Sequence, residues 1–434
     1  MKANLWMLSL LCCVLASPVD ARHSVQKEVT ESERIPVAMS EACAAKEQQS
    51  FSFEVCNPVD EERTDAPVVI SLASLKLPFS PQSATVSLAG EEIPSQLDDL
   101  DGDGRADELA VVVTMPGRTT LPLVVTLSQA KSDKSYPART FAQMLIRDGK
   151  KEKHAQATSL TVPGSANVYN LIYGHGPMME SELVGYRIYF NAKQTLDPYG
   201  KFQKRLELAD CSFYPSDDQL AKGFGDDVLM VGNSCGVGAL KGWNGEKATH
   251  IEPIASRTER VVASGPVRAI LEVEIKGWQY QGEEIEMTQH YLLYAGHRDL
   301  QITTTFTRPL GETTFCTGAQ RIMGTETVMD SDHEGLVGSW GRHWPVTDTV
   351  KYAKETIGIA TYIPQRYLRK EVSDKDNFLY LIAAPGQQIF TYYTMFTSRK
   401  ETFGFPDAEA WFAEMRRWKA RIEQPIVVKR TKNR

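Results

Sequence analysis

The chain has 434 residues, of which 42% are hydrophobic and 24% charged, and its formal net charge is −7 at pH 7. This length suits two or three domains, and the composition is typical of a folded globular protein and not of a disordered chain. The acidic balance leaves no basic face that would attract a phosphate backbone, so nucleic acid is excluded as an expected partner.

An export signal is predicted at the N-terminus. The chain begins MKANLWMLSLLCCVLASPVDARHS, with one lysine, a short apolar core, and small residues at Ala16 and Ala21 where cleavage would occur. The apolar core is too short to cross a bilayer, and no other segment approaches about 20 apolar residues. We interpret residues 1–21 as a signal peptide for export to the periplasm or the exterior. Attachment to a lipid through Cys12 or Cys13 fits less well, because no small residue precedes them.

A polar leader over residues 22–47 precedes a predicted small β-sandwich over residues 48–132. The sandwich is indicated by short Val-rich or alternating runs such as APVVISLASLKL, ELAVVVTMP and TTLPLVVTLSQ. Proline, glycine, asparagine and aspartate separate these runs, which is the pattern of antiparallel strands joined by turns.

The most conspicuous motif in this sandwich is the loop LDDLDGDGRADEL. Asp99, Asp101, Asp103 and Asp107 follow the spacing DxDxDGxxD, and carboxylate oxygens in this number suit calcium. An EF-hand would close the site with a glutamate, but Ala110 stands there and strands flank the loop. We therefore predict a structural calcium loop between two strands. The alternative is a metal-free acidic turn held by hydrogen bonds from backbone N–H groups to the aspartates.

A larger β-domain is predicted over residues 140–430. In EEIEMTQHYLLY, every second residue from Ile285 to Leu293 shares one strand face, and Gly282 and Gly296 stand where hairpin turns are needed. Long consecutive strands of this kind favour a large antiparallel sheet.

Two helices interrupt the β pattern. Ser216 and Gln219 form a capping box in YPSDDQLAKGFG, which predicts a short helix. A longer helix is predicted to begin after the N-cap Asp407 and to end before Pro425. It stacks four apolar side chains on one face, and we expect that face to dock on the sheet: Trp411, Met415, Trp418 and Ile422.

Five cysteines follow the signal, and their spacing matches no zinc motif. Disulfides are compatible with an exported protein, with Cys43 and Cys56 the closest pair in sequence, and an odd thiol would remain. The motifs of a serine hydrolase elbow, a zinc protease, a phosphate-binding P-loop and a dinucleotide fold are all absent from the sequence. No organic cofactor is therefore predicted.

Residues able to perform acid–base chemistry gather in NLIYGHGPMMESELVGYRIYFNAKQTLDPYGK, residues 170–201, and in two later stretches around His250 and His297. An arginine can neutralise a sugar carboxylate while a histidine or tyrosine moves a proton. The competing interpretation of each histidine is a surface or hydrogen-bonded structural residue, and Arg187 is alternatively a buried salt-bridge partner.

Long segments of the chain resemble a secreted bacterial family catalogued as domain of unknown function 4861. The resemblance is carried by HGPMMESELVGYRIYFNAKQTLDPYGK, by GFGDDVLMVGNSCGVGALKGWNGEKATHIEPIASRTERVVASGPVRAILEV, by TFCTGAQ and by LDDLDGDGRADELAV. It implies an association with polysaccharide utilisation, an all-β architecture similar to the galactose-mutarotase-like supersandwich of several polysaccharide lyases, and a uronate-directed eliminase activity.

The resulting hypothesis is an exported carbohydrate-active enzyme that performs β-elimination on uronate-containing oligosaccharides or polysaccharides, as a dehydratase or a lyase. The predicted catalytic residues, each able to move a proton, are His175, Tyr186, Tyr199 and His250. The predicted substrate-binding residues, which would hold the carboxylate or the hydroxyls, are Glu182, Arg187, Arg257 and His297.

Two other functions remain open at this point. A non-catalytic glycan-binding protein would stack sugar faces on Trp243, Trp278, Trp340 and Trp344. A mutarotase or glycosidase would use carboxylates in place of the arginines and tyrosines. The sequence predicts neither the particular glycan nor the oligomeric state.

Overall fold

Residues 47–149, 151–324 and 327–431 are described by a computed structural model, and they form mostly antiparallel β-sheets. The predicted all-β class is therefore confirmed. The predicted signal peptide, almost all of the predicted leader and Cys43 lie outside the described residues.

A small sandwich is built from two sheets, and alternating side chains such as Leu123, Val125 and Leu127 fill its core. The three-stranded sheet has the order β2 (Arg63–Ser71), β6 (Glu108–Met115) and β5 (Ser95–Asp98), and the short helix η1 (Leu72–Leu75) follows β2. The five-stranded sheet has the order β29 (Val427–Arg430), β1 (Gln48–Cys56), β7 (Thr120–Ser128), β3 (Ser83–Leu88) and β4 (Glu91–Ile93).

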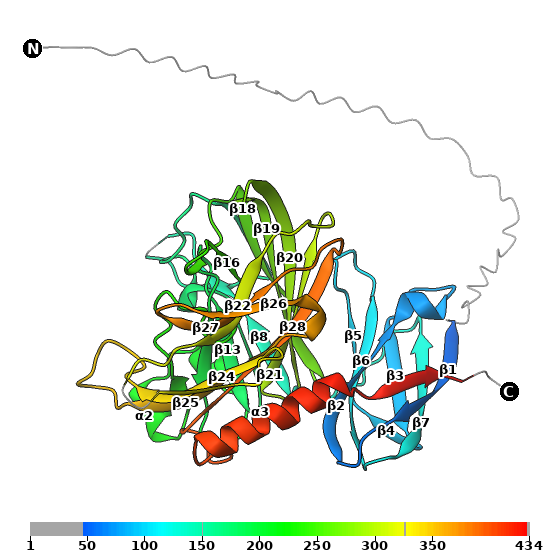
Figure 1. Cartoon of the computed structure of the whole chain (residues 1–434). Coiled ribbons are helices and arrows are strands. Elements are labelled where there is room, and N and C mark those ends of the chain that lie inside the picture. The colour runs from blue at the N-terminus through cyan, green and yellow to red at the C-terminus, as the bar shows by residue number, and fades with distance from the viewer. Residues whose placement is uncertain (1–46, 150, 325–326, 432–434) are drawn as a thin grey trace, which may run out of the picture. The chain divides into compact units, whose positions relative to one another are not determined.

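The last strand, β29, belongs to this small sandwich although residues up to 430 were predicted to lie in the larger domain. It pairs with β1, with Phe53 opposite Arg430 and Cys56 opposite Val427. Figure 1 shows this strand at the red end of the chain, within the small sandwich. The sequence of a four-residue strand is too short to predict which strand it pairs with, because the pairing depends on which sheet edge is free.

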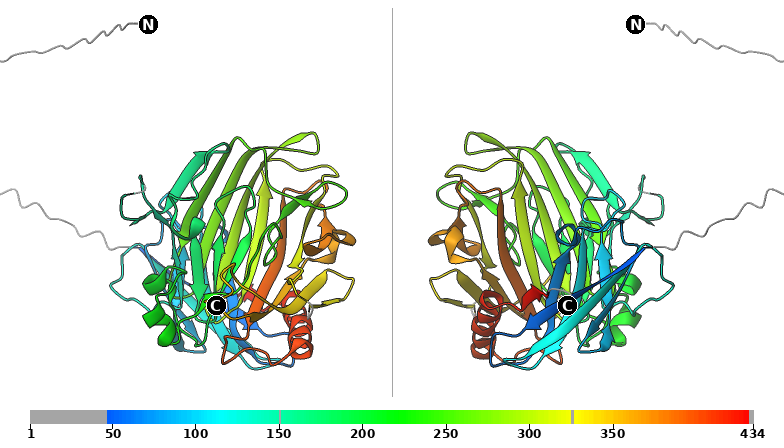
Figure 2. Two further views of the ribbon diagram at one scale, coloured as in Figure 1. Left: turned by 90° about the vertical axis from the view of Figure 1, so that its left-hand side faces the viewer. Right: turned by 90° about the vertical axis from the view of Figure 1, so that its right-hand side faces the viewer.

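A nine-stranded antiparallel sheet organises the rest of the fold, and its long strands lie side by side in Figure 2. Gln281 and Gly282, both with positive φ, close the hairpin between β19 and β20, as a tight two-residue turn requires. The sheet order is β11 (Ser159–Pro163), β18 (Ser256–Ala263), β19 (Arg268–Tyr280), β20 (Glu283–Tyr294), β21 (Asp299–Phe306), β28 (Ile389–Ser398), β25 (Glu355–Tyr362), β24 (Leu336–His343) and β23 (Val328–Ser331).

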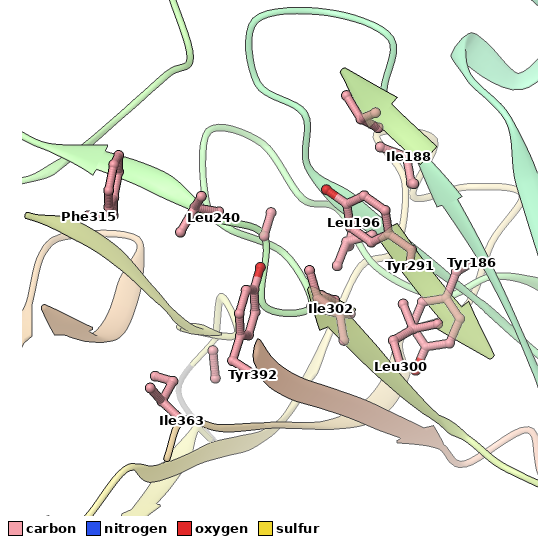
Figure 3. Close-up of a cluster of buried hydrophobic side chains, with 14 of the residues drawn as sticks. Tyr186, Ile188, Leu196, Leu240, Tyr291, Leu300, Ile302, Phe315, Ile363 and Tyr392 are labelled. Atoms are coloured by element: carbon pink, nitrogen blue, oxygen red, sulfur yellow. The ribbon is translucent and has the colours of Figure 1, made fainter. Parts of the chain in front are cut away.

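Two five-stranded sheets share the main hydrophobic core with the nine-stranded sheet, and Figure 3 draws some of the core side chains from all three. The first has the order β15 (Asp226–Asp227), β14 (Leu196–Gly200), β13 (Val184–Ile188), β12 (Met178–Ser181) and β8 (Thr140–Gln143). The second has the order β17 (Ala248–Thr249), β16 (Lys241–Trp243), β22 (Phe315–Gln320), β27 (Asn377–Ile382) and β26 (Leu368–Ser373). A separate pair joins β9 (Leu145–Ile146) to β10 (Ala155–Gln156).

The two predicted helices are present, with the predicted caps. Ser216 and Gln219 form the capping box of α2 (Asp217–Ala221), and Asp407 accepts a hydrogen bond from the Ala410 N–H at the start of α3 (Ala408–Glu423). Trp411, Met415 and Trp418 are buried against β24, β25 and β28, as predicted. The remaining short helices are α1 (Leu208–Cys211), η2 (Tyr173–His175) and η3 (Gln365–Tyr367).

Four cysteines lie in the described part of the chain, and all are free thiols: Cys56, Cys211, Cys235 and Cys316. A bridge from Cys56 to Cys43 involves a residue outside that part. Over the described ranges, no helix combines the length and the apolar character that a membrane crossing requires.

Candidate functional site

A cavity with a volume of about 870 Å³ opens beside β11 and β18, at one edge of the nine-stranded sheet. Three loops and the ends of two strands form its wall. Arg257 is the one lining residue with a full positive charge, and Glu252 is the one lining carboxylate. The remaining lining residues are apolar or neutral: Val162–Tyr169, Phe190–Ala192, Ile251, Pro253 and Ile254.

Arg257 projects from β18 on the same face as the core and is almost fully buried. Its Nη2 donates to Gln194 Oε1 at 3.5 Å, and its Nε has no hydrogen-bond partner among the described residues. Burial lowers the pKa of the guanidinium, although the nearby carboxyl of Glu259 acts in the opposite direction. A buried guanidinium with an unused donor is costly unless a ligand accepts from it.

A hydrogen-bond chain continues from Arg257 across the sheet. Gln194 Nε2 donates to Gln289 Oε1 at 2.5 Å and lies 3.1 Å from the Tyr291 hydroxyl, and Gln289 Nε2 donates to Thr304 Oγ1 at 2.9 Å. These groups are buried and fix the position of Gln194. The orientation of Arg257 at the cavity is therefore determined by residues on β20 and β21.

Further cationic groups lie close to Arg257, and none forms an ion pair with a buried carboxylate in the described part of the chain. Lys241 on β16 is fully buried and donates to the Lys193 carbonyl and to Thr195 Oγ1. Burial lowers the pKa of Lys241 to about 8, with smaller contributions in the same direction from Lys193 and Arg257. This region of the protein is positively charged and therefore favours an anionic ligand.

His250 belongs to the same region. It is half-buried, next to the cavity residue Ile251, and its Nδ1 lies 3.6 Å from Glu252 Oε1. Burial and the charge of Lys241 lower its pKa, so the imidazole is neutral at neutral pH and able to accept a proton.

His175 reaches the cavity through its neighbour Tyr169. The two rings are stacked with centroids 3.8 Å apart, and His175 Nδ1 lies 3.0 Å from the Tyr169 carbonyl oxygen. Tyr189 lies on the other side of the imidazole, nearly parallel to it, with centroids 6.3 Å apart. Burial lowers the pKa of His175. Since Nδ1 faces the carbonyl and donates to it, Nε2 is the nitrogen left to take a proton.

Behind this ring stack lies a buried ionic network centred on Arg187. The guanidinium donates to Asp197 Oδ2 at 2.5 Å and to Asp227 Oδ2 at 3.1 Å, and it also contacts the hydroxyls of Tyr189 and Tyr214. Burial opposes the charge of Arg187, but the two carboxylates outweigh it and its pKa is raised. This guanidinium is already neutralised, which matches the alternative interpretation of Arg187 as a buried salt-bridge partner.

Two predicted catalytic tyrosines have no access to a ligand. Tyr186 is fully buried in the main core beside Leu300 (Figure 3), and its hydroxyl donates to the Arg298 carbonyl oxygen. Tyr199 is fully buried on the other side of the same sheet, and its hydroxyl donates to Glu207. Every residue of β13 and β14 is buried because both faces of this sheet are covered, so neither hydroxyl can reach a departing oxygen.

Two predicted substrate-binding residues instead connect the small sandwich to the large sheet. Glu182 forms an ion pair with Arg139, which also binds Asp65, and accepts from the Gly296 N–H. His297 contacts the Asp65 carbonyl oxygen and the Asp299 carboxylate. Burial opposes the charge of His297, but Asp299 outweighs it and the pKa of the imidazole is raised. These partners leave Glu182 and His297 in structural roles.

The aspartate loop joins β5 to β6, as predicted for a loop between strands. Carboxylate oxygens of Asp99, Asp101 and Asp107 lie within 4.8 Å of one another. Asp103 is not part of this group among the described residues and accepts a hydrogen bond from the Arg105 N–H. Asp99 accepts from the N–H groups of the two loop glycines, so the loop also contains the hydrogen bonds expected of an acidic turn.

Sequence reasoning missed several parts of the site: Gln194, Lys241, Glu259, and Tyr169 and Tyr189 as the partners of His175. One feature of the sequence could have identified part of the site. Arg257 and Glu259 occupy the inner face of their strand, where apolar residues are expected. Gln194 approaches Arg257 from a distant segment and Lys241 from a separate strand, and no local sequence pattern marks either residue.

Comparison with known proteins adds little about chemistry. An α-mannosidase from Enterococcus faecalis V583 aligns at 12% identity and a TM-score of 0.45, over 89% of this chain and 46% of that one. A protein in glycosyl hydrolase family 38 from Enterococcus faecalis aligns at 11% identity and a TM-score of 0.43, over 89% and 48%. The chain thus spans about half the length of these structures.

No curated protein matches the sequence. The model of one family, described as a domain of unknown function (DUF4861), matches residues 55–428. This match spans both the small sandwich and the large sheets and agrees with the resemblance found in the sequence. The chain belongs to the DUF4861 family.

Proposed function

We propose that the protein is an exported enzyme that performs β-elimination on uronate-containing oligosaccharides in the cavity beside β18. The observation that carries the proposal is Arg257, a buried arginine at a cavity of about 870 Å³ with an unused Nε donor and no paired carboxylate among the described residues. A sugar carboxylate supplies the acceptor that this guanidinium lacks. The cavity volume is within the range of sites that hold small ligands.

The chemistry needs a base beside the carboxylate. In β-elimination the base removes the proton from the carbon next to the carboxylate, a carbon–carbon double bond forms, and the bond to the oxygen on the following carbon breaks. Arg257 would stabilise the negative charge that develops on the carboxylate. His175 Nε2 would take the proton, because this imidazole is neutral and its ring partner Tyr169 lines the cavity.

The departing oxygen needs a proton in return. Of the tyrosines near the site, we choose Tyr189 as the donor, since it is only partly buried and its ring lies nearly parallel to that of His175. Its hydroxyl donates to Asp197 in the free protein and would turn from that carboxylate to the departing oxygen. Burial and the Asp197 carboxylate raise the pKa of Tyr189, so the phenol keeps its proton in the resting enzyme. Tyr189 thus replaces Tyr186 and Tyr199 in the proposal. A departing hydroxyl would make the enzyme a dehydratase, and a departing sugar would make it a lyase.

The two rival functions receive less support. Trp278 and Trp340 are buried in the hydrophobic cores, so a glycan-binding protein would keep two of its four predicted stacking residues. Glycoside hydrolysis uses a pair of carboxylic acids, whereas Glu252 is the one carboxylate among the described residues lining the cavity.

The test is to incubate the purified protein with oligosaccharides that end in a uronate and with polymeric uronates. We expect an unsaturated product, seen as rising absorbance at the far-ultraviolet edge. Replacing His175 with Gln should lower turnover by about two to four orders of magnitude while glucuronate binding persists. His333→Gln is the matched control, because His333 is exposed and pairs with Glu371. A pure binding protein would retain binding and give no product in any variant, and that result would refute the proposal.

A further inference from the structure

Arg257 has a second buried neighbour that the proposed chemistry does not use. Glu259 lies two residues along β18, so both side chains point to the inner face of the sheet. Glu259 is fully buried, and neither of its carboxyl oxygens has a hydrogen-bond partner among the described residues.

The surroundings explain why this carboxyl is unpaired. Its partners across the neighbouring strands are Leu160 on β11 and Val273 on β19, and neither side chain can donate a hydrogen bond. Burial raises the pKa of Glu259 to about 8, and Arg257 is the group that opposes this rise. The carboxyl is therefore neutral at neutral pH, and the charge of Arg257 remains uncompensated.

Other groups that titrate or carry charge face the pair from three elements. Tyr291 on β20 is buried, and its pKa is raised by burial, so it stays neutral. Glu252 acts on Arg257 from the cavity wall. Lys241 on β16 interacts with Arg257, and its pKa of about 8 means that it loses its charge in the same range where Glu259 gains one.

We propose that Glu259 controls the affinity of Arg257 for an anionic sugar: its protonated carboxyl leaves the guanidinium free for a uronate carboxylate, and its ionised form displaces that carboxylate by neutralising Arg257. The inference rests on the proposed function in taking the ligand to be a uronate. It adds a specificity-determining residue that does not touch the reacting atoms.

The proposal predicts that the affinity for the uronate falls as the pH rises. A bound carboxylate disfavours a second negative charge beside Arg257, so the liganded protein keeps the proton on Glu259 to higher pH than the free protein does. Affinity is then highest below about pH 8 and falls up to about tenfold for each pH unit above it. Binding near this pH also takes up a proton from the buffer.

The experiment is isothermal titration calorimetry of the full chain with D-glucuronate from about pH 7 to about pH 9.5, with D-glucose as the uncharged control. We expect glucuronate affinity to drop about tenfold or more over this range in the wild type. Glu259→Gln keeps the shape of the side chain but cannot ionise. In this variant the decrease in glucuronate affinity with pH should be smaller, and only the part caused by the titration of Lys241 should remain. Arg257→Gln should lose glucuronate binding at every pH, because the carboxylate has lost its partner.

Glu274→Gln is the matched control, since Glu274 alternates with the core residues of β19 and pairs with Arg260 and Lys276. Circular dichroism confirms that each variant is folded. The inference is overturned if Glu259→Gln keeps the full pH dependence of the wild type, or if wild-type protein binds no glucuronate. Binding with this pH dependence but without product would refute the eliminase proposal alone.

Discussion

Arg187 and Arg257 carry the same charge in opposite surroundings. Arg187 is held by Asp197 and Asp227, whereas Arg257 has one long contact to Gln194 and an unused Nε. An arginine that already binds two carboxylates has little uncompensated charge with which to bind a substrate. Removing it would leave two buried anions without a partner. We therefore assign ligand binding to Arg257 and the positioning of Tyr189 to Arg187.

The raised pKa of Glu259 predicts how the stability of the protein depends on pH, as well as how its ligand affinity does. Its pKa in the folded protein is about 8, above the usual 4.5, so between these values the folded state holds a proton that the unfolded state has released. Stability contributed by this group must fall as pH rises through that window. Denaturation experiments at about pH 5 and about pH 8 measure the free energy of unfolding of the wild type and of Glu259→Gln. Relative to the wild type, the variant should be more stable at the higher pH than at the lower one, by a few kcal/mol. An equal difference at both pH values would show that Glu259 is ionised throughout.

At the scale of elements, β18 and its neighbours place the site, and the loop from β5 to β6 is a separate structure. The carboxylates of Asp99, Asp101 and Asp107 converge at an exposed loop in the small sandwich. Hard oxygen ligands at this spacing suit calcium, and an ion would remove the repulsion among them.

We predict that calcium raises the melting temperature of the protein by several degrees and that a chelator reverses this effect. Asp101→Asn should abolish the calcium response without changing turnover, because the loop takes no part in the cavity. Asp133→Asn, outside the loop, serves as the control. A melting temperature that is the same with calcium and with chelator would favour the metal-free acidic turn.

Over the whole molecule, sequence patterns predicted those features that depend on residues close together in the chain. The strands of the small sandwich, the alternation from Ile285 to Leu293 and the caps of α2 and α3 all follow from neighbouring residues. Contacts between distant segments were not predictable. The pairing of β29 with β1 and the contact of Gln194 with Arg257 join residues far apart in the chain.

The candidate site was predicted in part for the same reason. His175 and Arg257 were identified from residue type, because an arginine can neutralise a sugar carboxylate while a histidine moves a proton. Tyr186 and Tyr199 were chosen from a strand that alternation describes well, but alternation does not reveal that sheets cover both faces. Burial on both sides, and not the spacing of the residues, decides which tyrosine a substrate can meet.

The most direct measurement uses a uronate-terminated oligosaccharide carrying deuterium on the carbon next to the carboxylate. The proposed elimination predicts an unsaturated product that has lost this deuterium, a slower rate than with the unlabelled sugar, and no product from Arg257→Gln. Mass spectrometry of the products reads all three. Release of a saturated sugar that keeps its deuterium, or undiminished turnover by Arg257→Gln, would contradict the account.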